Sequence, residues 1–117
     1  MLIVYVYQKC STCRDALKWL NARGIPHQVK AIRETPPTRA ELATALEARG
    51  GDLRKIFNTS GIDYRALGLK DQISALSDSA AFELLSQNGN LVKRPFVIGA
   101  DKTLVGFKPA DWEKAFA

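Results

Sequence analysis

A strand followed by two cysteines and a helix, all within the first 32 residues, constrains this fold more than any other feature. Leu2–Tyr7 is a continuous apolar run of aliphatic and aromatic residues, which is typical of a strand in the middle of a sheet. Apolar residues then recur at helical spacing until Gly24. Residues 26–32 predict a second strand, with Val29 and Ile32 expected to point inward. Because such connections are almost always right-handed, the segment predicts a parallel βαβ unit.

The remainder of the chain predicts a helical stretch and then a hairpin. Pro36-Pro37 interrupts the chain, and helical patterns occupy most of residues 36–90. Phe96–Ile98 and Thr103–Val105 predict two strands joined by a short turn, and a last helix follows them. The order βαβ, helical stretch, ββα is the outline of an α/β thioredoxin-like fold with an all-helical insertion. We expect residues 1–117 to form one domain of this kind.

Composition excludes several classes of protein. The apolar content of 46% argues against disorder, and no apolar run approaches the ~20 residues that cross a bilayer. No secretory signal pattern is present, so we expect a cytoplasmic protein without a membrane partner. The net charge of +5 favours an anionic substrate or an acidic protein partner, although ordinary solubility charge would explain it too. Without a compact basic run, direct nucleic-acid binding is not expected.

Cys10 and Cys13 are the only thiols, and they carry the predicted chemistry. Positions three apart on a helix share a face, so the two sulfurs can meet. A thiolate at a helix N-terminus is stabilised by unpaired N–H groups and by the helix dipole, and Lys9 and Arg14 should act in the same direction. We therefore expect Cys10 to be the nucleophile and Cys13 to be the resolving thiol that closes an internal disulfide.

Two other interpretations of the cysteine pair stay open at this point. The thiols could be inert, or they could form half of a zinc site. Zinc would need two further ligands, and the chain offers only His27 and acids, so we expect no metal. We interpret His27 itself as an ordinary strand or loop residue.

The start of the first helix is also predicted from its residue types. Either Ser11 or Thr12 can cap the helix, and Asp15 is expected in its first turn. Thr12 and the backbone N–H groups of this first turn are expected to cradle an anionic substrate, and Lys9, Ser11 and Arg14 are expected among the residues that bind it.

Arg94-Pro95 is the second feature with a predicted function. A proline directly before a buried strand is awkward for sheet pairing, and a cis peptide bond would reconcile the two. In a thioredoxin-like fold this proline would lie beside the thiols, and Arg94 would point its donors towards an anion near Cys10. The alternative is a plain turn proline with a surface arginine.

Six short segments give the chain a resemblance to a known family. They are Tyr7–Arg14, Glu34–Pro37, Phe57–Gly61, Leu67–Lys70, Leu91–Pro95 and Val105–Lys108. With these segments the chain resembles the arsenate reductase (ArsC)/Spx family over essentially its whole length. The resemblance implies a mixed four-stranded sheet, a helical insertion and a cis Pro95.

In the arsenate reductases of that family, the cysteine matching Cys10 attacks arsenate, glutathione and glutaredoxin reduce the adduct, and the arginine matching Arg94 stabilises the oxyanion. This chain differs at three positions: Asn58 and Lys108 stand where those enzymes carry two further arginines, and Cys13 stands where they have a serine. Lysine keeps the charge without the bidentate fork, and asparagine keeps neither. The resemblance therefore implies weak or absent arsenate reduction.

The cysteine pair is more similar to the Spx/MgsR-like branch, in which a dithiol switch controls a regulator that binds the C-terminal domain of the α subunit of RNA polymerase. Two functions consequently stay open. One is a thiol–disulfide reductase acting on a small thiol, a disulfide or an oxyanion such as arsenate, with glutathione/glutaredoxin or thioredoxin as reductant and no bound cofactor. The other is a redox-switch transcriptional regulator.

Overall fold

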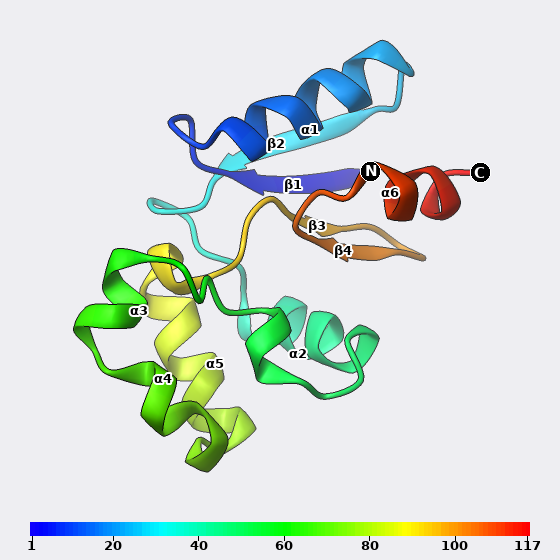
Figure 1. Cartoon of the computed structure of the whole chain (residues 1–117). Coiled ribbons are helices and arrows are strands. Elements are labelled where there is room, and N and C mark those ends of the chain that lie inside the picture. Colours follow the sequence, from blue (N-terminus) through cyan, green and yellow to red (C-terminus); the bar gives the residue numbers. More distant parts are fainter.

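The central strand β1 (Leu2–Val6) organises a four-stranded sheet of order β2-β1-β3-β4 in the computed structural model, which describes residues 1–117 (Figure 1). It pairs in parallel with β2 (His27–Ala31) and antiparallel with β3 (Phe96–Ile98). β3 in turn pairs antiparallel with β4 (Thr103–Val105). The predicted parallel βαβ unit and the mixed thioredoxin-like sheet are confirmed.

Different helices cover the two faces of the sheet, because successive residues of β1 point to opposite faces. Val4 lies in an apolar cluster with α1 (Ser11–Ala22) and with Trp112 of α6 (Pro109–Ala115). Tyr5 instead lies in a larger cluster with residues of the helices between β2 and β3. Figure 1 shows these helices on the far side of the sheet from α1. No helix is long and apolar enough to span a bilayer.

The insertion is helical throughout. Its elements are α2 (Arg39–Ala48), η1 (Leu53–Lys55), α3 (Ile62–Ala66), α4 (Leu69–Gln72), η2 (Ile73–Ala75), α5 (Asp78–Gln87) and η3 (Gly89–Leu91). The side chains of Thr38 and Glu41 form a capping box at the start of α2, and Ser77 caps α5. These caps satisfy backbone N–H groups that have no partner within the helix, and so they fix where the two longest helices of the insertion begin.

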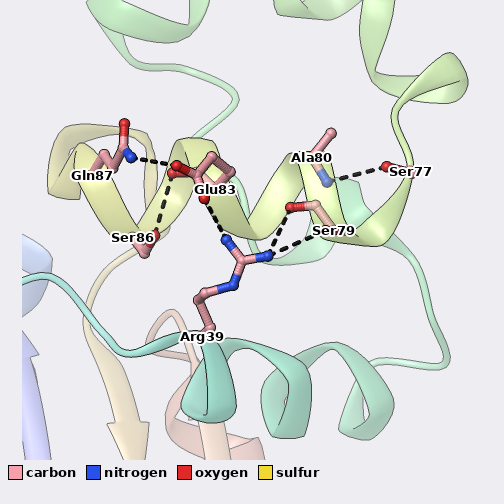
Figure 2. A network of polar contacts seen from close by, with 7 residues as sticks. All are labelled: Arg39, Ser77, Ser79, Ala80, Glu83, Ser86 and Gln87. Atoms are coloured by element: carbon pink, nitrogen blue, oxygen red, sulfur yellow. Dashed lines mark hydrogen bonds and ion pairs between the residues drawn. The ribbon is translucent and has the colours of Figure 1, made fainter.

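Polar contacts join the start of α2 to α5 across the surface of the insertion. The guanidinium of Arg39 pairs with Glu83 and donates to the hydroxyl and the carbonyl oxygen of Ser79 (Figure 2). On the same helix, Glu83 accepts from the amide of Gln87. Exposed pairs of this kind contribute roughly 0–1 kcal/mol each, so the buried apolar cluster is the main connection between the two helices.

The cap of α1 differs from the sequence prediction. The N-cap is Cys10, in extended backbone conformation, and its sulfur accepts a hydrogen bond from the backbone N–H of Cys13. Ser11 and Thr12 are therefore the first two residues of the helix and do not cap it. Because the helix begins at Ser11, Asp15 lies beyond the first turn, where the dipole acts on it only weakly.

The inward-pointing residues of β2 were only partly predicted. β2 is an edge strand, and Val29 in it is 48% exposed. Ile32, the first residue after the strand, is fully buried in the cluster of the insertion. The ring of His27 makes a local hydrogen bond between Nδ1 and the carbonyl oxygen of Ile25.

Candidate active site

The two thiols lie where β1 gives way to α1. Cys10 is half-buried and Cys13 is 1% exposed, and both are reduced. The backbone N–H of Cys10 donates to the carbonyl oxygen of Tyr7, and Cys10 Sγ lies 3.3 Å from the backbone nitrogen of Cys13. This tight turn places the Cys10 sulfur at the N-terminus of α1, with the second thiol one turn deeper.

The surroundings push the pKa values of the two thiols apart. Burial alone would raise the pKa of Cys10, but hydrogen bonds from the thiol and N–H of Cys13 and the contact with Arg94 outweigh burial and lower it. Burial and the neighbouring Cys10 raise the pKa of Cys13 to about 12. The pair therefore favours ionisation of the more accessible Cys10 over ionisation of the buried Cys13.

The cation that acts on Cys10 is Arg94, whereas the sequence predicted Lys9 and Arg14 for this role. Both predicted residues are exposed, and neither is among the groups that lower the Cys10 pKa. The Arg14 guanidinium turns back to the carbonyl oxygen of Gln8, at 3.4 Å. Side chains that flank a helix cap point outward, so neighbours in the sequence are not neighbours of the sulfur.

A cavity of about 350 Å³ opens over Cys10. It brings together five of the predicted site residues, which are Cys10, Thr12, Asn58, Arg94 and Lys108. Ser11 and Pro95 do not line it. Ser11 is exposed, and Pro95 is buried with its carbonyl oxygen accepting a hydrogen bond from the N–H of Gly106, which closes one wall of the cavity.

Lys93 also lines this cavity and was not predicted as a site residue. A Cβ at Gly106 would lie 3.1 Å from Lys93 Cε, and the Gly106 φ of +80° also disfavours a side chain there. The glycine thus gives the lysine stem room to lie across the backbone. The signal that could have identified Lys93 is its place in the run Lys93-Arg94-Pro95, directly before the buried strand.

Arg94 has the geometry of an anion-binding residue. Its peptide bond to Pro95 is cis, and its Nη1 atom is buried without any hydrogen-bond partner. An unpaired buried donor is unfavourable, so this nitrogen is suited to an acceptor supplied by a ligand. Lys93 and Lys108 line the same cavity and no acidic residue does, so the site is electropositive beside a thiolate.

Residues 5–115 match the ArsC family. The chain belongs to the ArsC family. It is 43% identical to the protein YusI of Bacillus subtilis strain 168 over 99% of this chain and 98% of YusI. It is also 27% identical to the global transcriptional regulator Spx of Streptococcus pneumoniae strain R6, over 92% of this chain and 79% of Spx.

A solved structure described as a possible arsenate reductase from Streptococcus mutans UA159 is similar to this ArsC-family protein along nearly its whole length. The two chains are 40% identical, with a TM-score of 0.88, and the match covers 97% of this chain and 98% of the other. The relatives therefore include both a regulator and an arsenate-reductase-like protein.

Within this ArsC-family site, Asn58 faces the thiol cavity from the insertion. Its backbone N–H donates to the carbonyl oxygen of Leu91 at 2.7 Å, and its side-chain amide lies 3.4 Å from the carbonyl oxygen of Asn90. Asn58 therefore stands in the wall of the cavity as a fixed, uncharged donor. No group of three or more His, Cys, Asp and Glu side chains suited to a metal ion occurs in the structure.

Proposed function

We propose that this ArsC-family protein is a thiol–disulfide oxidoreductase in which Cys10 is the nucleophile and Cys13 resolves the intermediate. The observation that carries the proposal is the asymmetry of the pair, with a lowered pKa at the accessible Cys10 and a raised pKa at the buried Cys13. Low-pKa, accessible thiols beside a second thiol are the ones that react reversibly with oxidants.

The reaction with a disulfide substrate balances without a metal or bound cofactor. The Cys10 thiolate attacks one sulfur of the substrate, which breaks the substrate disulfide and releases one thiolate. Cys13 then gives up its proton and attacks the Cys10 sulfur, which releases the second thiol and leaves a Cys10–Cys13 disulfide. Two electrons have moved from the protein to the substrate. A thiol reductant, glutathione with glutaredoxin or thioredoxin, returns the pair to the dithiol in a reducing cytoplasm.

The cavity favours a substrate with an anionic group next to the reacting atom. Arg94 offers an unpaired buried donor, Lys93 and Lys108 add positive charge, and Thr12 lies at the start of α1. Arsenate is a weaker candidate than a small anionic disulfide, because the site has one guanidinium and two ammonium groups. Each missing charge-assisted bond would forgo roughly 1.5–3 kcal/mol of binding.

The proposal is tested by oxidising the reduced protein with a small neutral disulfide, hydroxyethyl disulfide. The mass of the intact chain should fall by about two hydrogens as the internal disulfide closes, and reduced glutathione or thioredoxin should reverse the change. Cys10→Ser should abolish the reaction. A mixed disulfide that accumulates on Cys10 and never resolves would overturn the proposal. Arsenate-dependent oxidation of a nicotinamide cofactor, coupled through glutathione and glutaredoxin, should be weak.

A second function, redox regulation of transcription, is favoured by the similarity to Spx and by one structural observation. The Cys10 sulfur caps α1 by accepting from the backbone N–H of Cys13, so closing the disulfide replaces a thiolate acceptor with a neutral sulfur and weakens this cap at the start of the helix. A partner that contacts this turn could sense the change. The test compares, side by side, how the reduced and the oxidised protein capture the C-terminal domain of the α subunit of RNA polymerase.

Replacing Arg94 by glutamine should weaken anion binding and raise the Cys10 pKa, because the positive charge beside the sulfur is lost. Alkylation of Cys10 at pH 6 should slow by about tenfold, and added arsenate or sulfate should no longer protect the thiol. Arg14→Gln is the matched control, since Arg14 is close to Cys10 in the sequence but does not line the cavity. Equal effects of the two substitutions would contradict the assignment of the anion site.

A further inference from the structure

We propose that Tyr7, braced by Arg33, is a positioning residue that holds the Arg94 guanidinium beside Cys10. The inference rests on the proposed function, because it explains how the anion-binding arginine of that site is oriented. Tyr7 does not touch the reacting sulfur through its side chain. It acts on Arg94, and Arg94 acts on the thiolate and its substrate.

Sheet register brings Tyr7 and Arg94 together. β1 and β3 pair antiparallel with Tyr5 opposite Phe96, so continuing the register by two residues brings Tyr7 level with Arg94. The Cζ atom of Arg94 lies over the Tyr7 ring, 5.1 Å from its centroid. That separation lies within the range of cation–π attraction, and a guanidinium stacks well on an aromatic face.

Arg33 fixes the ring in turn. Its Cζ atom lies 4.9 Å from the centroid of the Tyr7 ring, and its Nη1 donates a hydrogen bond to the Tyr7 hydroxyl at 3.1 Å. The three side chains line a second cavity of about 500 Å³, which shares Arg94 and Asn58 with the thiol cavity. The guanidinium over the ring and the hydrogen bond to its hydroxyl together restrict the ring at one face and at its tip.

An aromatic ring is a suitable support for an arginine that must bind an anion. Arg94 forms no ion pair with any carboxylate, since the three ion pairs of the chain involve Arg23, Arg39 and Lys102. A carboxylate partner would orient Arg94 but would neutralise its charge and occupy its donors. The face of a ring orients the group and leaves the N–H donors at the guanidinium edge available, which agrees with the unpaired Nη1.

The charged groups around the site separate the roles of the two arginines. Asp63 accepts hydrogen bonds from Asn88 and Asn90, which lower its pKa, and a further lowering comes from the charge of Arg33. Arg33 therefore has a nearby negative charge. Asp63 also lines the second cavity with Arg94, but the two form no ion pair, and the group that Arg94 acts on is the Cys10 sulfur. Lys93 and Lys108, the other charged residues that line the thiol cavity, carry the same sign as Arg94.

The test is the pH profile of Cys10 alkylation by iodoacetamide, measured in full-length variants. Tyr7→Leu removes the ring and should slow alkylation below neutral pH about three- to tenfold, because a loosened Arg94 no longer favours the thiolate. Tyr7→Phe keeps the ring and should restore most of the rate. Tyr64→Leu is the matched control: Tyr64 is a buried ring with no guanidinium over it, so this change should lower the melting temperature without moving the profile.

A double-mutant cycle then asks whether Tyr7 acts through Arg94. In an Arg94→Gln background, Tyr7→Leu should produce no further change in the profile. An additive effect of the two changes, or a Tyr7→Leu profile identical to wild type, would overturn the positioning role while the proposed redox function stands. If Arg94→Gln alone leaves the profile unmoved, the anion site of the proposed function fails as well.

Discussion

Substituting Cys13 is expected to convert a reversible oxidation of this protein into an irreversible one. Peroxide takes the Cys10 thiolate to a sulfenic acid, and in the wild type Cys13 condenses with it to form the internal disulfide and release water. Without a second thiol the sulfenic acid persists and is oxidised further to sulfinic acid. The wild type should therefore lose about two hydrogens in mass and recover with a thiol reductant, whereas the variant should gain about two oxygen atoms and not recover.

Two different substitutions separate the two roles of Cys13. Cys13→Ser keeps a hydrogen-bond donor towards the Cys10 thiolate and removes only the resolving sulfur. Cys13→Ala removes the donor as well, so the Cys10 pKa should rise and alkylation at pH 6 should be slower than in Cys13→Ser. Both variants should end as sulfinic acid. Recovery of either variant by reductant, or equal alkylation rates in the two, would contradict the roles assigned to this residue.

The lowered pKa of Cys10 also fixes the direction of a pH effect on stability. A thiol whose pKa is lower in the folded state than in the unfolded chain stabilises the fold where it is ionised. That stabilisation is complete above the pKa of the thiol in the unfolded chain, and it is lost as the pH falls through the pKa in the folded protein. Cys13 acts in the opposite direction, because its pKa is raised in the folded protein. Its stabilisation is complete below the pKa in the unfolded chain and is lost as the pH rises through the pKa in the folded protein.

Much of the fold could be predicted because its signals are local. The apolar run of β1, the capping box of Thr38 and Glu41 and the turn before β4 each depend on a few adjacent residues. The thiol pair could be predicted equally well, since its spacing is a property of one helix. The exposure of Val29 could not be predicted, because it depends on which strand forms the edge of the sheet.

The cation beside the thiol shows why the rest of the site could not be predicted from spacing alone. Lys9 and Arg14 are close to Cys10 in sequence, yet the charge that acts on the sulfur comes from Arg94. Pairing of β1 with β3 brings that residue across. The proline before β3 and the family resemblance both predicted Arg94 near the thiol, whereas the roles of Lys93 and of the Tyr7 ring depend on contacts between segments that only the structure reveals.

Gly89→Ala is expected to destabilise the fold more than an ordinary substitution of a surface glycine. Gly89 is the first residue of η3, and it is buried against the chain that leaves β2. A Cβ there would lie 1.8 Å from the carbonyl oxygen of Ile32 and 3.1 Å from the Cα of Arg33. These are backbone atoms, so no side chain can rotate away, and the two segments would have to separate.

The expected loss in the free energy of unfolding is about 3 kcal/mol or more, at the upper end of what overpacking a core costs. Gly50→Ala is the matched control: a Cβ at Gly50 meets open space, and its φ of +69° should cost only about 1–2 kcal/mol. Urea denaturation of both variants measures the difference. Because the chain after Gly89 leads through Lys93 to Arg94, residual folded Gly89→Ala protein should also show slower Cys10 alkylation at pH 6. A Gly89→Ala variant as stable as Gly50→Ala would show that the two segments are free to move apart.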